Sequence, residues 1–137
     1  MSPRTTVDEL LGAARRRLAR LDPSSAREAM VSGATLIDIR ADSQIAADGT
    51  IPGALVIPRN VLEWRLDPSS GHGHPRAPEL DDKVILFCNE GYASSLAAAT
   101  LQDLGFTRAT DLDGGFQAWR EAGLPVEPAP QGADRPH

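Results

Sequence analysis

Residues 84–95 read Val-Ile-Leu-Phe-Cys-Asn-Glu-Gly-Tyr-Ala-Ser-Ser. The apolar run is typical of a short buried strand, and the serine pair is typical of a helix start. Between them lies Cys88, the only cysteine of the chain, followed by a loop that contains Gly91. Such a loop places a thiol at the mouth of a ring of backbone N–H groups, which favours an anionic sulfur. The stretch therefore predicts a strand–loop–helix unit with a nucleophilic cysteine.

Length and composition limit what this chain can be. Its 137 residues suffice for one domain with a core, and its net charge of −5 argues against nonspecific nucleic-acid binding. No apolar run is long enough to span a membrane, and no apolar signal core follows the first residues. Because a lone cysteine cannot form an internal disulfide, we expect a protein of a reducing cytoplasm.

The segments before residue 84 alternate between helix and strand patterns. Thr6 and Glu9 fit a capping box, and apolar residues at helical spacing then predict a helix over 7–21. Its arginines (Arg15, Arg16, Arg17 and Arg20) are expected on a solvated face. Further patterns predict a helix that begins with a capping box at 25–28 and ends at 32–33, a strand over 34–39, a helix over 42–47, a strand over 55–57, a helical turn over 60–64 and a loop over 67–78.

After the cysteine loop, the pattern predicts a helix that starts at Ser94 or Ser95 and ends before Gly105, a strand over 108–112 and a helix over 116–122. From Pro125 on, the composition favours disorder. We expect Trp64 and Trp119 in the core. His72 and His74 lie in a loop without a nearby set of metal ligands, so no metal site is expected.

Short apolar strands that alternate with helices predict an α/β fold with a mostly parallel central sheet and helices on both faces. In such folds the ligand crevice lies outside the carboxyl ends of the strands. Asp38 and Arg40, Arg59, Cys88 and residues 113–115 each follow a predicted strand. We therefore expect them together at one end of the sheet.

Several ordered segments match one known family. They are Leu36–Arg40 with its Asp-x-Arg ending, Ile51-Pro52-Gly53-Ala54, Cys88-x-x-Gly91 followed by Ser94, Leu104-Gly105-Phe106, and Asp113-Gly114-Gly115-Phe116-x-x-Trp119. In this set the chain resembles the single-domain rhodanese-like sulfurtransferases. The resemblance implies a rhodanese-like α/β domain over 24–126, with an N-terminal helical extension over 1–23 and a disordered tail over 127–137.

The resemblance also implies a chemistry. The Cys88 thiolate would take a sulfane sulfur from thiosulfate or a persulfide, and then pass it to a thiol, cyanide or protein acceptor without a cofactor or metal. Arg40 and Arg59 would bind an anionic donor, although Arg40 is equally placed for a structural pair with Asp38 and Arg59 for a solvated loop. The residues implied around the transferred sulfur are Asn89, Glu90, Gly91, Tyr92, Ala93 and Ser94.

The chain departs from the family pattern at three positions. Glu90 and Ala93 stand where thiosulfate-active members often carry basic side chains, which disfavours a dianionic donor and favours a persulfide or protein-bound donor. Thr50 replaces a histidine that usually precedes Ile-Pro-Gly, which we expect to affect local packing.

Other functions stay open at this point. A phosphatase of the Cys-x5-Arg type is disfavoured because Ser94 stands in place of the arginine. A noncatalytic rhodanese-fold module that binds a partner or senses oxidants through Cys88 is the main alternative. The N-terminal helix could cover the sheet, contact an acidic partner or mediate a dimer, and the oligomeric state is not set by the sequence.

Overall fold

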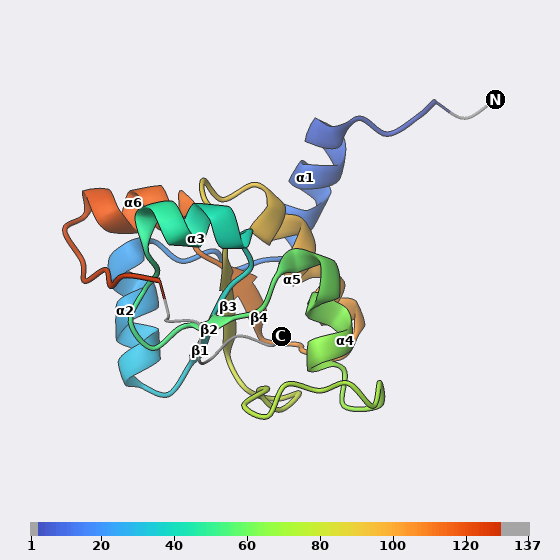
Figure 1. Ribbon diagram of the computed structural model, residues 1–137. Helices are drawn as coiled ribbons and strands as arrows, with labels where there is room; N and C mark the ends of the chain where they lie inside the picture. The colour runs from blue at the N-terminus through green and yellow to red at the C-terminus, as the bar shows by residue number, and fades with distance from the viewer. Residues whose placement is uncertain (1–2, 130–137) are drawn as a thin grey trace.

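A parallel sheet of four strands forms the centre of the computed structural model, which describes residues 3–129 (Figure 1). The strand order is β2–β1–β3–β4, and every neighbouring pair is parallel. The expected α/β fold is therefore confirmed. The strands are β1 (Thr35–Asp38), β2 (Leu55–Val56), β3 (Val84–Phe87) and β4 (Ala109–Asp111).

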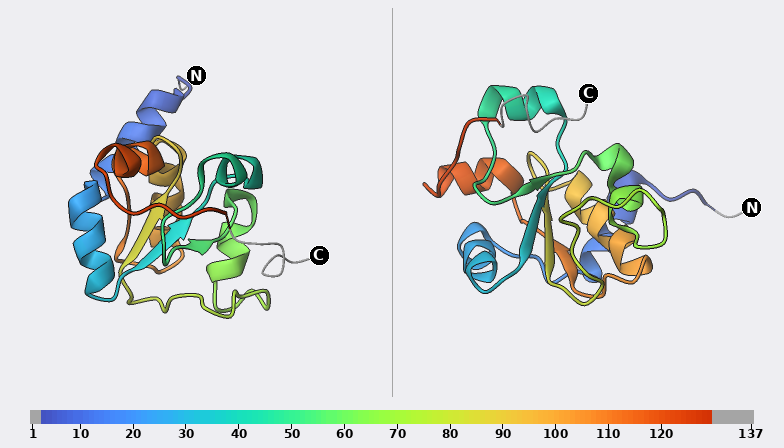
Figure 2. Two further views of the ribbon diagram at one scale, coloured as in Figure 1. Left: turned by 60° about the vertical axis from the view of Figure 1, so that its left-hand side comes forward. Right: turned by 60° about the horizontal axis from the view of Figure 1, so that its bottom comes forward.

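Helices cover both faces of the sheet, because the central strand is apolar on both sides. Val84 and Leu86 of β3 pack with the apolar side chains of α4 and α5, whereas Ile85 and Phe87 pack with those of α2 and α6. Figure 2 shows the two helix layers on opposite sides of the strands. The layers are formed by α2 (Pro23–Val31) and α6 (Gly115–Glu121) on one face, and by α4 (Leu62–Leu66) and α5 (Ala93–Asp103) on the other.

The N-terminal helix α1 (Val7–Arg16) begins as predicted and ends earlier. Thr6 and Glu9 form the expected capping box, with both hydrogen bonds at 3.1 Å. The helix does not reach residue 21, because Leu21 pairs with the edge of the sheet: its N–H donates to the carbonyl of Asp111, and its carbonyl accepts from the N–H of Asp113. Backbone pairing at an open sheet edge thus replaces the last helical turn.

The next two helices begin in different ways. Asp22 caps α2 in place of the expected serine, and Pro23 occupies the first turn. The short α3 (Asp42–Asp48) begins after Ala41 without a side-chain cap. The predicted turn after β2 is a 3-10 helix, η1 (Arg59–Val61), that leads into α4.

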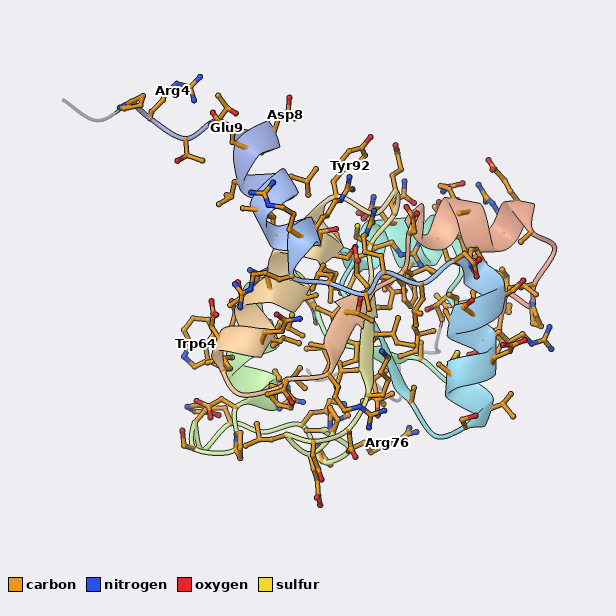
Figure 3. All side chains as sticks on the ribbon, turned by 180° about the vertical axis from the view of Figure 1, so that it is seen from behind. Arg4, Asp8, Glu9, Trp64, Arg76 and Tyr92 are labelled. Carbon is orange, nitrogen blue, oxygen red and sulfur yellow. The ribbon has the colours of Figure 1, made fainter. Side chains whose placement is uncertain are left out.

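One of the two tryptophans is not in the core. Trp119 is buried and donates from Nε1 to the carbonyl of Pro125. Trp64, in contrast, is 57% exposed on the outside of α4, so the expectation for it is wrong (Figure 3). Leu62 and Leu66 take the buried side of this short helix, and Trp64 lies between them on the other side.

The segment after α6 is fixed over part of the stretch expected to be disordered. Glu127 pairs with Thr50 in an antiparallel bridge that has two backbone hydrogen bonds of 2.9 Å. Residues 125–127 are therefore fixed by contacts with Trp119 and Thr50. Residues 130–137 of the predicted tail lie outside the described residues. None of the helices within 3–129 is both long and apolar enough to cross a bilayer.

A buried ion pair fixes the end of β1. Arg40 donates to both carboxylate oxygens of Asp38, at 3.0 and 2.8 Å, and also to the carbonyl of Gly49. Thr50 donates its hydroxyl proton to the same carboxylate at 2.7 Å. The guanidinium lies over the Phe116 ring, 4.1 Å from its centroid. Thr50, at the position of the family's histidine, is buried and bound to Asp38, so it belongs to the structure at the end of β1.

Replacing Arg40 tests whether this pair is structural. Arg40→Leu leaves the Asp38 carboxylate buried without its cation, so we expect the free energy of unfolding to fall by about 3–5 kcal/mol. Thr50→Val removes one hydrogen bond to that carboxylate and should cost about 2 kcal/mol. Urea unfolding followed by circular dichroism measures both. An Arg40→Leu protein of unchanged stability would contradict the structural role.

Helix α6 approaches the cysteine loop without an intervening side chain. The N–H groups of Phe116 and Gln117 donate to the carbonyls of Cys88 and Asn89, at 2.9 and 3.1 Å. Gly115 has φ +61°, and a Cβ there would lie 2.5 Å from the Cys88 carbonyl oxygen. Only glycine fits such a close approach at this backbone angle.

Gly115→Ala should therefore destabilise the protein by about 2 kcal/mol or more. Gly73→Ala is the matched control, because no heavy atom lies within 4 Å of a Cβ built at that position. The control is expected to stay within about 0.5 kcal/mol of the unmodified protein. Equal unfolding midpoints for the two variants would mean that α6 can withdraw from the loop at no cost.

Candidate active site

Cys88 lies at the carboxyl end of the central strand, where the loop curls around its sulfur. The side chain is largely buried, with 8% of the residue surface exposed. The N–H groups of Gly91 and Ser94 lie 3.2 and 3.4 Å from Sγ, and the Ser94 hydroxyl oxygen is 3.4 Å away. The two backbone N–H groups can stabilise a thiolate at Sγ. The Ser94 hydroxyl donates its proton to Asp111 and is an acceptor toward Sγ.

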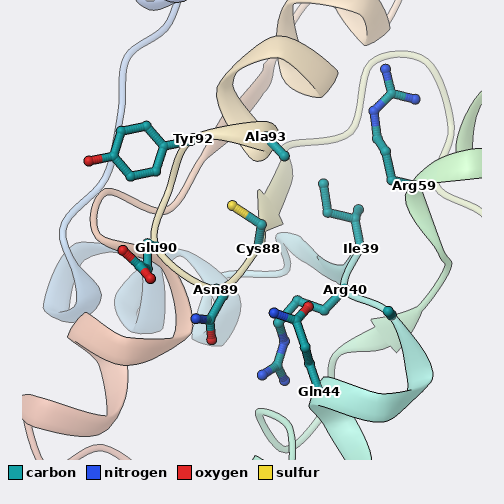
Figure 4. Close-up of a pocket in the computed structure, with 10 residues that line it drawn as sticks. Ile39, Arg40, Gln44, Arg59, Cys88, Asn89, Glu90, Tyr92 and Ala93 are labelled. Carbon is teal, nitrogen blue, oxygen red and sulfur yellow. The ribbon is translucent and has the colours of Figure 1, made fainter.

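A pocket opens in front of this sulfur, at the carboxyl ends of three strands (Figure 4). The structure thus brings most of the predicted site residues together. Gly91 and Ser94 lie behind the sulfur and not on the pocket wall. The pocket is lined by the predicted Arg40, Arg59, Cys88, Asn89, Glu90, Tyr92 and Ala93, and by Ile39, Ala41 and Gln44, which were not predicted.

The two arginines of the pocket both have carboxylate partners. Arg40 is bound to Asp38, and its guanidinium points away from Sγ (Figure 4). Arg59 donates from one nitrogen to both oxygens of Glu63, at 2.8 and 2.9 Å. Both lie at the predicted end of the sheet, and the contacts of Arg40 match the structural alternative raised for it.

The side chains of the loop leave the space in front of Sγ largely free. Glu90 is exposed, and its carboxylate points away from Sγ (Figure 4). Ala93 stands at the rim with its methyl group. The Asn89 side chain accepts a hydrogen bond from Gln117 at 2.9 Å. Tyr92 is 60% exposed, with the Arg15 guanidinium 5.5 Å from its ring centroid.

Behind the loop lies a buried carboxylate that was not predicted. Asp111, at the end of β4, accepts hydrogen bonds from the hydroxyls of Ser94 and Ser95, at 2.8 and 2.7 Å. These serines thus bind a carboxylate and do not cap α5, which begins at Ala93. Arg20 completes the group with bonds of 2.9 and 3.2 Å to the two oxygens of Asp111.

Two arginines of the N-terminal segment also hold the loop directly. Arg15 and Arg20 both donate to the Gly91 carbonyl, at 2.8 and 3.0 Å, and Arg15 also donates to the Ser95 hydroxyl. The expectation that this basic face is only solvated is therefore wrong for these two residues. The helix ends in a turn at Arg17, and the non-helical residues 18–20 that follow bring Arg20 to the loop.

Arg20 stays charged in this setting. Burial alone would lower the pKa of its guanidinium, but the hydrogen bond and charge of Asp111, the charge of Asp113 and that of the Cys88 thiolate together raise the pKa above its ordinary value. A permanent positive charge therefore lies behind the cysteine loop.

No metal centre is evident in the described part of the chain. Residues 3–129 contain no cluster of three or more histidine, cysteine or carboxylate side chains suited to a metal ion. His74 uses its Nδ1 to accept a hydrogen bond from the Arg76 N–H at 2.9 Å.

Comparison with known proteins places this geometry in a family. A family model for the rhodanese-like domain matches residues 22–122. The thiosulfate sulfurtransferase GlpE of Ectopseudomonas mendocina is 38% identical over 115 residues, which cover 84% of this chain and 94% of that protein.

Solved structures share the fold of this chain. A Rhodopseudomonas palustris protein of unknown function, described as a possible tyrosine phosphatase, superimposes with a TM-score of 0.82 at 35% identity and covers 93% of this chain and all of its own. A human single-domain sulfurtransferase has a TM-score of 0.65 at 32% identity, over 74% of this chain and 95% of its own. The chain belongs to the rhodanese-like domain family.

Proposed function

We propose that this protein is a sulfurtransferase that carries a sulfane sulfur on Cys88. The observation that supports it most directly is the position of the Cys88 sulfur. It faces a pocket and accepts hydrogen bonds from two backbone N–H groups of its own loop. The family, and relatives named as sulfurtransferases, support the same chemistry.

In the first step the Cys88 thiolate attacks the outer sulfur of the donor. A Cys88 S–S bond forms, and the bond between the donor's outer sulfur and the rest of the donor breaks. With thiosulfate the leaving group is sulfite, and with a persulfide it is a thiolate that takes the electron pair of the broken bond. The negative charge ends on the terminal sulfur of Cys88, so the charges balance.

In the second step an acceptor attacks that terminal sulfur. Cyanide becomes thiocyanate, or a thiolate becomes a persulfide, and the Cys88 thiolate is restored. The N–H groups of Gly91 and Ser94 hold the negative sulfur of Cys88 as it leaves.

We further propose that a persulfide is a better donor than thiosulfate. Glu90 points outwards and does not face a donor directly. However, Arg40 and Arg59, the cations of the pocket, are engaged by Asp38 and Glu63. A sulfonate dianion would therefore meet guanidinium groups whose charge is already balanced by a carboxylate, whereas a persulfide brings less charge. We propose a reducing cytoplasm as the compartment, since this chemistry needs Cys88 as a thiolate.

Mass spectrometry of the intact protein tests the persulfide. After incubation with a small persulfide, thiosulfate or mercaptopyruvate, Cys88 should gain the mass of one sulfur atom, fastest with the persulfide. Addition of cyanide should remove that mass and release thiocyanate. Cys88→Ala should abolish the mass gain and the turnover.

The alternatives give different results in the same experiment. No sulfur adduct with any donor would favour the noncatalytic or redox-sensing module. Sulfur transfer that persists in Cys88→Ala would refute the assignment of the nucleophile. Hydrolysis of an aryl phosphate is not expected, because Ser94 occupies the place of the phosphatase arginine and binds Asp111.

Arg59 can be tested as a donor-binding residue through its partner. Glu63→Gln removes the charge that engages Arg59, so the KM for thiosulfate should fall about two- to fivefold, and Arg59→Ala should raise it by a similar factor. Steady-state assays with cyanide as acceptor measure both. Unchanged KM values in both variants would exclude Arg59 from the donor site.

A further inference from the structure

The N-terminal segment supplies positive charge to the cysteine loop from behind. Arg15 and Arg20 converge on one acceptor, the Gly91 carbonyl, at 2.8 and 3.0 Å. Both residues lie outside the stretch 22–122 that matches the family model. Gly91 is also the residue whose N–H lies 3.2 Å from Sγ. The arginines therefore contact the same residue that contacts the sulfur.

The contact has a defined effect on the loop. In a planar trans peptide the carbonyl and the following N–H point in opposite directions. Two guanidinium groups that hold the Gly91 carbonyl outwards thus also fix the direction of the Tyr92 N–H. The loop is thereby fixed at Gly91, between the two N–H groups, of Gly91 and Ser94, that contact Sγ. Gly91 itself has φ +92°, and a Cβ there would lie 2.9 Å from the Gly114 nitrogen, so the loop has little other freedom.

Arg20 has a second task, at Asp111. The Ser94 hydroxyl oxygen lies 2.8 Å from this carboxylate and 3.4 Å from Sγ, so the carboxylate is one side chain away from the sulfur. A buried negative charge at this place opposes a thiolate or persulfide. Arg20 pairs with Asp111 through two bonds, and its side chain is only 16% exposed. The pair is neutral as a whole, so the repulsion between Asp111 and an anionic Cys88 sulfur is reduced.

We propose that Arg15 and Arg20 are positioning residues of the cysteine loop: they fix the Gly91 peptide, and Arg20 also neutralises Asp111 so that Cys88 can carry negative charge. The proposal rests on the proposed sulfur transfer for its purpose, but its geometry stands without it. The loop's own side chains, Glu90 and Ala93, provide no cation. The positive charge comes instead from a segment that precedes the family's domain.

The remaining charged groups around Cys88 are engaged elsewhere or point outwards. Arg40, after β1, is bound to Asp38, and Arg59, on η1, is bound to Glu63. Glu90 of the loop points away from Sγ (Figure 4). Asp113, after β4, is exposed and bonds to Arg20 at 3.1 Å. The Asp111–Arg20 pair is therefore the charged unit that most directly affects the sulfur.

The rate at which iodoacetamide alkylates Cys88, measured against pH, tests the charge effect without any sulfur donor. In Arg20→Gln the pH of half-maximal rate should rise by about one unit, because Asp111 then lacks its cation. Arg20→Lys should restore this pH. The double variant Arg20→Gln with Asp111→Asn should restore it too, since it removes both charges.

Steady-state kinetics test the positioning of the peptide. In Arg15→Gln and Arg20→Gln, kcat should fall about tenfold while KM changes less than twofold, because the lost hydrogen bond to the Gly91 carbonyl positions the loop around Sγ and does not contact the donor. Arg20→Lys should keep a reduced kcat, since an ammonium group cannot join Asp111 and Gly91 as the planar guanidinium does.

Arg17→Gln is the matched control: Arg17 belongs to the same segment but pairs with the exposed Asp103. It should leave the alkylation profile and kcat unchanged. Thermal unfolding confirms that each variant is folded, and Arg20→Lys and the double variant decide the question if Arg20→Gln does not fold. A folded Arg20→Gln protein with the original profile and kcat would overturn the proposal, as would a double variant that keeps the shifted pH. Failure of the wild-type protein to form a persulfide would refute the sulfur transfer alone.

Discussion

Asp111 is the buried carboxylate on which the cysteine site depends. It lies on the last strand of the sheet and accepts hydrogen bonds from Ser94, Ser95 and Arg20. It therefore joins β4 to the first turn of α5 and to the N-terminal segment. Burying a carboxylate without partners would cost several kcal/mol of folding free energy. Asp111 therefore needs its three donors, and it holds each of them in place. The cysteine loop is held in place because Asp111 binds the serines that follow the loop.

Charge is distributed unevenly around the sulfur. In front, the cations of the pocket are tied to carboxylates, and the loop presents Glu90 and Ala93. Behind, Arg15 and Arg20 act through a peptide carbonyl. A cation in front would bind the donor's own charged group, whereas a cation behind stabilises the charge that remains on Cys88 in every step. This arrangement stabilises charge on Cys88 without adding a free cation for a doubly charged donor, in line with the proposed preference for a persulfide.

Patterns of short range predicted the fold well. The apolar run 84–87 and the loop after it gave the central strand and the cysteine's place, since strand ends in a parallel sheet meet at one edge. The role of Asp111 was not predictable in this way, because its partners lie up to 91 residues away along the chain. The same holds for Arg20, whose placement depends on the helix ending at Arg16. The exposure of Trp64 depends on which side of α4 faces the sheet, and five residues are too few to show that periodicity.

The segment around Glu127 packs against the loop after α3. It crosses Gly49 and Thr50 so closely that a Cβ on Gly49 would lie 2.3 Å from the Glu127 carbonyl oxygen. Thr50 in turn holds Asp38, and Trp119 donates to Pro125. The match to the family model ends at residue 122, but residues up to Glu127 pack against this side of the domain. At the other end, Arg20 and Leu21 precede the match and bind the edge of the sheet. Contacts that complete the core therefore extend beyond the matched residues 22–122 at both ends.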